Sequence, residues 1–255
     1  MLLTLDMGNT HITLGVFEGE TLRFTARMAT ELQRTEDQYA ADLLSIFSLH
    51  GVDCDKVNGA IIGSVVPALT GVLVKAVRET VGVTPLIVGP GVKTGLNIHI
   101  DQPAGLGADL VCGAVAAAAC MKTPCVIADL GTITKLCVLD ESGAFIGGAF
   151  SAGLGISLDA IAKRTAQLPY VALQAPERVI SPQTVGAIQS GTVFGAAAMI
   201  DGMLERMETE LGQPVSVIAT GGHCAQVVAH CKRKDIVVDE HLLLKGLKLI
   251  FDRNA

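Results

Sequence analysis

An internal repeat constrains the fold of this chain more than any other feature of the sequence. A short apolar segment ends at Asp6 and turns at Gly8, and the same order of residues recurs at Asp129 and Gly131, at a constant offset of 123 positions. Each turn is followed by a second β-rich segment, a further turn signal and a third strand-like segment. We therefore predict two copies of a β-meander, each opened by an acidic, glycine-containing hairpin. The alternative is a chance likeness between two short hairpins, because D-x-G turns are common.

The segments after each meander predict further strands and helices in both halves. Apolar side chains recur at helical spacing over residues 36–49 and 241–251, and residues 184–211 are typical of a long helix. Buried strands are expected at 60–66, before a helix at 68–80, and at 215–219. An alanine-rich helix at 107–121 connects the halves. These patterns predict an α/β fold with two similar lobes, residues 1–120 and 121–255, each a mixed sheet with flanking helices, and a cleft between them.

Composition excludes several classes of protein. Hydrophobic residues make up 50% of the chain, but charged residues interrupt every apolar segment before it reaches the roughly 20 residues of a membrane-spanning helix. The N-terminus lacks the basic start and cleavage site of a secretory signal. A formal net charge of −6 makes nucleic acid a poor partner. Seven cysteines without a CxxC pair indicate reduced thiols and a cytosolic protein.

The two predicted hairpins have the residue types that bind a nucleotide triphosphate. Small residues let backbone N–H groups approach phosphate oxygens, hydroxyl and amide side chains add donors, and a carboxylate at each turn is able to hold a cation. A Gly-Gly pair after the strand at 215–219 leaves room for a nucleoside, although it is also typical of a tight strand-to-helix turn. The residues in question are Asp6, Gly8, Asn9 and Thr10 in the first copy, Asp129, Gly131, Thr132 and Thr134 in the second, and Thr220, Gly221 and Gly222.

The ordered set of motifs resembles the type III pantothenate kinases, within the superfamily of sugar kinases, actin and the large heat-shock chaperones. The resemblance rests on D-x-G-N-T at 6–10, S-V-V-P at 64–67, G-A-D at 107–109, D-x-G-T at 129–132, G-G-x-x-x-x-G-L at 147–154 and L-K-G-L at 244–247. It covers essentially the whole chain. It implies an actin-like (ribonuclease H-like) fold and transfer of the γ-phosphate of ATP to pantothenate, the first step of coenzyme A biosynthesis. It also implies Mg²⁺, a monovalent cation (K⁺ or NH₄⁺) and a homodimer.

The resemblance also implies a role for particular residues. Asp109 is the expected general base, although an aspartate in the first turn of a helix is also favoured by the helix dipole alone. Asp129 is expected to hold the monovalent cation and Asp6 the Mg²⁺. Thr184 is expected to contact substrate, whereas its sequence context by itself predicts only a helix N-cap. The expected ATP-binding residues are Asp6, Met7, Gly8, Asn9, Thr10, His11, Ile12, Thr13 and Thr132, and the expected substrate-binding residues are Gly107, Ala108, Asp109, Leu110 and Thr184.

Three residues depart from the pattern of the family. Leu110 stands where many members have an arginine, and Ile100 where many have a tyrosine. Leucine has no donor for a substrate carboxylate, so the departures concern the acceptor and leave the ATP half of the prediction intact. Lys135 stands where a threonine is more usual, and strand alternation places it on the opposite face from Thr134. A kinase for another hydroxy acid and an inactive nucleotide-binding regulator are therefore the alternatives.

Overall fold

The computed structural model describes residues 1–255, which form two compact units. The first unit comprises Met1–Leu96, Gln102–Ala116 and Leu242–Ala255, and the second comprises Asn97–Asp101 and Ala117–His241. Each unit is built on one five-stranded mixed sheet with flanking helices. This arrangement confirms the predicted α/β class and the two mixed sheets.

The sheet of the first unit has the strand order β3-β2-β1-β4-β5. Strands β1 (Leu2–Met7), β2 (His11–Glu18) and β3 (Thr21–Ala29) form the antiparallel meander, and β4 (Gly59–Ser64) and β5 (Leu86–Ile87) add parallel strands beyond β1. The register places Asp6 opposite Thr13 on β2 and opposite Gly63 on β4. Asp6 therefore lies at the carboxyl end of a central strand.

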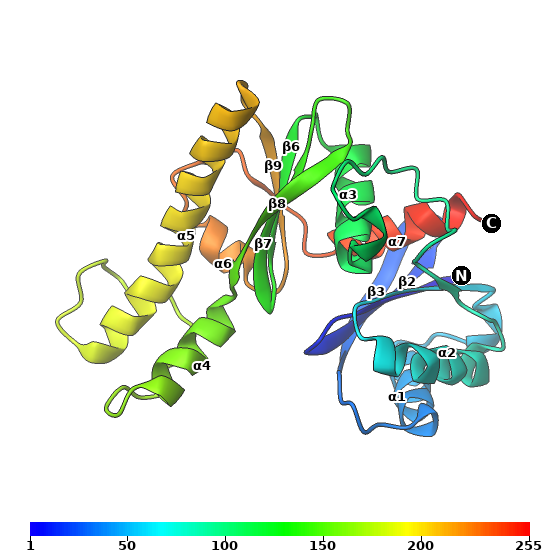
Figure 1. Ribbon diagram of the computed structural model, residues 1–255. Coiled ribbons are helices and arrows are strands. Elements are labelled where there is room, and N and C mark those ends of the chain that lie inside the picture. The colour runs from blue at the N-terminus through cyan, green and yellow to red at the C-terminus, as the bar shows by residue number, and fades with distance from the viewer. The chain divides into compact units, whose positions relative to one another are not determined.

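Helices cover both faces of this sheet. Alternation along β1 sends Leu3, Leu5 and Met7 into the core beneath α1 (Glu36–Leu49) and α2 (Pro67–Val81), which lie side by side in Figure 1. The other face packs against α7 (Leu242–Asp252) and the first part of α3 (Ala108–Cys120). Because Asp6 alternates with Leu5 and Met7, it lies on the face covered by α3 and α7. Two short 3-10 turns, η1 (Cys54–Lys56) and η2 (Pro103–Gly105), complete the unit.

The sheet of the second unit repeats the topology of the first. Its order is β10-β9-β6-β7-β8, with the meander formed by β6 (Cys125–Leu130), β7 (Ile133–Leu139) and β8 (Phe145–Ala152). Strand β9 (Ser216–Thr220) is parallel to β6, and β10 (Val237–Val238) is parallel to β9. The two sheets thus match strand for strand, which confirms the duplication predicted from the D-x-G repeat.

The core of the second unit lies between one face of this sheet and two helices. Val126, Ala128 and Leu130 of β6 pack against α5 (Thr184–Leu211) and α6 (Cys224–Val228). Helix α4 (Leu154–Arg164) follows β8. None of the helices is both long and apolar enough to cross a membrane. All seven cysteines are free thiols.

The division into units differs from the expected lobes at the C-terminus and also at Asn97–Asp101 and from Ala117 onward, which belong to the second unit. Residues 121–255 were expected to form one lobe, but Leu242–Ala255 belong to the first unit. The reason is the apolar face of α7, which places Leu244, Leu247 and Ile250 in one core with Ile61 of β4 and with α3. Elsewhere the predicted helices and strands differ from the observed ones by one or two residues at their ends.

Candidate functional site

The first hairpin is a short exposed loop tied to the chain beyond β3. The N–H of Gly8 donates to the carbonyl of His11 at 3.0 Å, which closes the turn. Thr30 holds the loop from the side, because its N–H donates to the Thr10 carbonyl at 3.0 Å and its Oγ1 to the Gly8 carbonyl at 2.8 Å. Asn9, Thr10 and His11 are exposed. The loop thus presents small polar groups from a fixed backbone, as phosphate binding requires.

Two residues of the predicted ATP site have side chains that face away from solvent. Met7 and Ile12 pair across the base of the hairpin, and both side chains are fully buried in the core beneath α1 and α2. Only their backbone groups are therefore available to a ligand at this position. Thr13 is half-buried and lies directly opposite Asp6.

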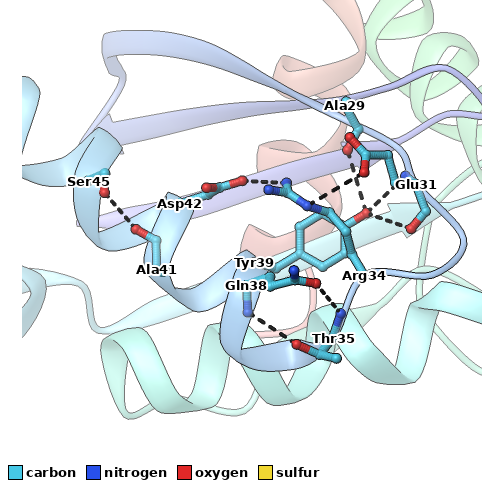
Figure 2. Close-up of polar contacts among 9 residues, drawn as sticks. All are labelled: Ala29, Glu31, Arg34, Thr35, Gln38, Tyr39, Ala41, Asp42 and Ser45. Atoms are coloured by element: carbon cyan, nitrogen blue, oxygen red, sulfur yellow. Dashed lines mark hydrogen bonds and ion pairs between the residues drawn. The ribbon is translucent and has the colours of Figure 1, made fainter.

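A polar cluster around the start of α1 fixes the segment that carries Thr30 (Figure 2). The Tyr39 hydroxyl accepts from the Glu31 N–H at 3.2 Å, and the Arg34 guanidinium lies 5.2 Å from the Tyr39 ring centroid. Arg34 also pairs with Asp42 at 2.5 Å. Thr35 and Gln38 form a capping box that begins the helix. Because Thr30 directly precedes Glu31, this cluster restricts the position of the residue that holds the hairpin.

Asp6 and Asp109 come from two elements of the first unit, β1 and α3, that pack against the same core. A Cβ on Gly63, the neighbour of Asp6 on β4, would lie 3.5 Å from the Cys112 Sγ and 3.9 Å from the Ala108 Cβ, so the end of β1 lies close to the first turn of α3. Burial raises the pKa of the Cys112 thiol well above its usual range, and the carboxylates of Asp6 and Asp109 raise it further. The thiol is therefore neutral, and the chemistry of this cluster rests with the two carboxylates.

The conformation of Asp109 depends on the G-A-D motif. The Leu110 N–H donates to Asp109 Oδ1 at 2.8 Å, so the carboxylate satisfies an amide of the first turn of α3. A Cβ on Gly107 would lie 2.5 Å from that same oxygen, which explains the glycine. Ala108 is buried, whereas Asp109 and Leu110 are partly exposed. The carboxylate lies at the end of the helix where the dipole is positive, at a partly exposed position.

The second hairpin lies against two glycines of its own unit. A Cβ on Gly153, at the start of α4, would collide with the carbonyl oxygens of Gly131 and Thr132. Gly221 follows β9 with φ of +93°, and a Cβ there would lie 2.7 Å from Asp129 Oδ1. Thr220-Gly221-Gly222 is thus a strand-to-helix turn, and its Gly221 lies beside the Asp129 carboxylate. Thr132 is exposed in the turn.

Lys135 is the main difference between the second hairpin and the first. It lies opposite Asp129 on β7, and its Nζ is 2.6 Å from Asp129 Oδ2. The predicted placement is confirmed, because Thr134 is buried on the opposite face of the strand with Leu136. Thr134 is therefore not an exposed donor at the hairpin, which corrects that part of the prediction. The ion pair itself was not predicted, since the constant offset of 123 aligns Lys135 with Ile12, whereas the shorter second turn makes it the equivalent of Thr13.

The structure also places Thr184, which the sequence predicted as a site residue, and Thr30, which it did not. Thr184 is the first residue of α5 and is exposed, but the N-cap is Gln183, which forms no side-chain cap. The predicted capping role of Thr184 is therefore wrong. Thr30 was overlooked because a single threonine after a strand carries no motif. Only its contacts reveal its role.

Comparison with known proteins agrees with the resemblance seen in the motifs. The family model of the type III pantothenate kinases matches residues 2–206. A type III pantothenate kinase of an Exiguobacterium species is 41% identical over 254 residues, covering 100% of this chain and 99% of that protein. A type III pantothenate kinase of Moorella thermoacetica is 38% identical over 255 residues, covering 100% of both chains.

Solved structures share the fold at much lower sequence identity. A putative Baf family transcriptional activator from Campylobacter jejuni superposes with a TM-score of 0.64 at 17% identity, over 99% of this chain and 98% of that one. An activator of 2-hydroxyisocaproyl-CoA dehydratase from Clostridium difficile, with bound ADPNP, gives a TM-score of 0.57 at 14% identity, over 99% and 95% of the two chains. At these identities the likeness concerns the fold alone.

Proposed function

Because this chain belongs to the type III pantothenate kinase family, we propose that it transfers the γ-phosphate of ATP to the 4′-hydroxyl of pantothenate, the first step of coenzyme A biosynthesis. The observation that carries the proposal is the family match over residues 2–206, with relatives about 40% identical over the whole chain. The closeness of the end of the sheet that carries Asp6 to the first turn of α3, which carries Asp109, supports it. The enzyme is an ATP-dependent phosphotransferase with an alcohol acceptor.

In this proposal the two D-x-G hairpins bind ATP. The fixed backbone and small side chains of the first loop suit phosphate oxygens, and Met7 and Ile12 contribute through the main chain only. Thr132 contributes a hydroxyl from the second hairpin. The residues assigned to ATP are Asp6, Met7, Gly8, Asn9, Thr10, His11, Ile12, Thr13 and Thr132.

Asp6 has the properties of a Mg²⁺ ligand. Mg²⁺ in kinases is held by one or two carboxylates together with phosphate oxygens and water. Asp6 fits this pattern, because it is a partly exposed carboxylate at the end of β1, next to the phosphate-binding loop. When bound, the ion neutralises charge on the phosphates.

Asp109 is the proposed general base. It accepts the proton of the pantothenate hydroxyl while that oxygen bonds to the γ-phosphorus of ATP, and the bond to the bridging oxygen breaks to release ADP. The amide of Leu110 donates to the carboxylate and holds it in place at the first turn of α3. Gly107, Ala108 and Leu110 of the same turn, and Thr184 at the start of α5, are the proposed substrate contacts.

Leu110 favours a second candidate, a kinase for another small hydroxylated acceptor. A leucine offers no donor to a carboxylate, and the loss of one charged hydrogen bond costs roughly 1.5–3 kcal/mol, or about 10- to 100-fold in affinity. If pantothenate is the acceptor, a different group neutralises its charge.

A comparison of pantothenate with its uncharged amide tests the acceptor. We expect phosphorylation of pantothenate, identified by the mass of the product, with kcat/KM at least about 10-fold higher for the acid than for the amide. Equal rates for acid and amide would remove the carboxylate site and favour the other acceptor. Absence of any phosphorylated product would contradict the kinase itself.

A homodimer and a cytosolic location are part of the same proposal. Four exposed apolar side chains lie on the meander and the following helix of the second unit, namely Ile133, Ile146, Phe150 and Ile156. They support a surface that a second subunit covers. The seven free thiols support a reducing compartment.

A further inference from the structure

Asp129, which was expected to bind a monovalent cation, forms an ion pair with Lys135. The two side chains are 15% and 14% exposed, and their charged atoms are 2.6 Å apart. A charge-assisted hydrogen bond of this length is among the stronger polar contacts in proteins. The pair is therefore well shielded from solvent and is built into the second hairpin.

The position of Lys135 follows from the strand register. Residues directly opposite each other on antiparallel strands interact through their side chains, and the register of β6 and β7 makes Lys135 the partner of Asp129. The same position in the first hairpin holds Thr13, opposite Asp6. The corresponding pair in the first hairpin, Asp6 and Thr13, therefore has no ammonium group.

The surroundings of Asp129 do not fit a monovalent cation. On one side, Oδ1 lies beside Gly131 and Gly221, where an added Cβ would come to 3.3 Å and 2.7 Å from that oxygen. On the other side, Oδ2 already contacts the Lys135 ammonium. K⁺ needs several oxygen ligands, and a second positive charge on this carboxylate would be repelled by the first.

We propose that the Lys135 ammonium replaces the monovalent cation on Asp129, so that phosphotransfer by this chain does not depend on K⁺ or NH₄⁺. A lysine ammonium carries the same charge as either ion and has the same donor chemistry as NH₄⁺. Because it is tethered to β7, it is present at every concentration of salt. The inference rests on the proposed function for its rate measurement but not for its binding measurement.

The rate measurement compares cations at equal ionic strength. Phosphotransfer by the parent protein, with ATP and Mg²⁺, is measured in K⁺, NH₄⁺, Na⁺ and N-methylglucamine buffers, and we expect rates within about twofold of one another. Lys135→Thr, which recreates the pair of the first hairpin, is expected to lose about 10-fold or more in Na⁺ and to recover in K⁺ or NH₄⁺. Lys163→Thr, which breaks the exposed pair with Asp159 at 3.0 Å, is the matched control and should behave as the parent.

Thermal unfolding provides a readout that needs no activity. Titration with K⁺ against Na⁺ is expected to raise the Tm of Lys135→Thr and of Lys135→Gln, but not of the parent or of Lys163→Thr. Stimulation of the parent by K⁺ of about 10-fold or more would overturn the inference, as would variants at Lys135 that respond to K⁺ in neither rate nor Tm. If neither the parent nor any variant phosphorylates pantothenate, the proposed function fails, but the Tm titration still tests the role of Lys135.

Discussion

Thr30 connects the phosphate hairpin to the rest of the first unit. Its two hydrogen bonds, to the carbonyls of Gly8 and Thr10, are the contacts that hold the loop from the side. The cluster of Arg34, Tyr39 and Asp42 fixes the adjacent residue. Fixed donors bind an anion better than mobile ones, since less ordering is needed on binding. Thr30 is thus a positioning residue for the proposed ATP site.

Thr30→Val keeps the shape of the side chain but removes the hydroxyl that donates to Gly8. We expect the KM for ATP to rise about 3- to 10-fold while the KM for the acceptor is unchanged, because one hydrogen bond contributes roughly 0.5–1.5 kcal/mol. Thr25→Val on the preceding strand β3, opposite Gly15, is the control. An unaltered KM for ATP in Thr30→Val would show that the hydroxyl does not position the loop.

At the scale of elements, α7 couples the end of the chain to the helix that carries Asp109. Leu244 and Leu247 enter the core shared with α3, while a Cβ on Gly246 would collide with the backbone carbonyl of Cys112. The L-K-G-L motif is therefore explained by packing, with glycine at the point of closest approach. Lys248, next on α7, pairs with Glu20 and Asp252, each at 2.7 Å.

Gly246→Ala forces α7 and α3 apart, so we expect it to lower the free energy of unfolding by about 1–3 kcal/mol. We also expect a lower kcat, because Asp109 at the start of α3 is displaced. Gly71→Ala in α2 is the control, because no atom lies within 4 Å of its Cβ position. That change should stabilise the protein by about 0.5–1 kcal/mol. Urea unfolding measures both variants. Equal effects of the two changes would contradict the close crossing of α3 and α7.

At the scale of the whole molecule, much of the fold was predictable because the sequence contains an internal repeat. The repeat around Asp6 and Asp129 predicted both meanders, and apolar spacing predicted most helices. The position of α7 was not predictable, since an amphipathic face indicates burial but not the partner that buries it. The Asp129–Lys135 pair was missed for a different reason: cross-strand partners depend on the length of the turn, which a constant offset conceals.

Only those residues of the candidate site that belong to a recognisable motif were predictable from the sequence. Asp109 was selected by its motif, and the structure adds that the same carboxylate also satisfies the amide of Leu110. Catalysis and capping are therefore compatible roles for one residue. Thr30 belongs to no motif, and Gly153 belongs to the G-G-x-x-x-x-G-L motif without a predicted role. Both are important through contacts with residues distant in sequence.

The most direct test of the account is single-turnover phosphorylation of pantothenate by the parent protein and by Asp109→Asn. Formation of phosphopantothenate is followed by mass after mixing with ATP and Mg²⁺, with Asp159→Asn in α4 as the control and ATP affinity measured in parallel. We predict product from the parent, a rate about 10²-fold lower or more in Asp109→Asn, and unchanged ATP binding. A rate in Asp109→Asn within about threefold of the parent would contradict the assignment of Asp109 as the base.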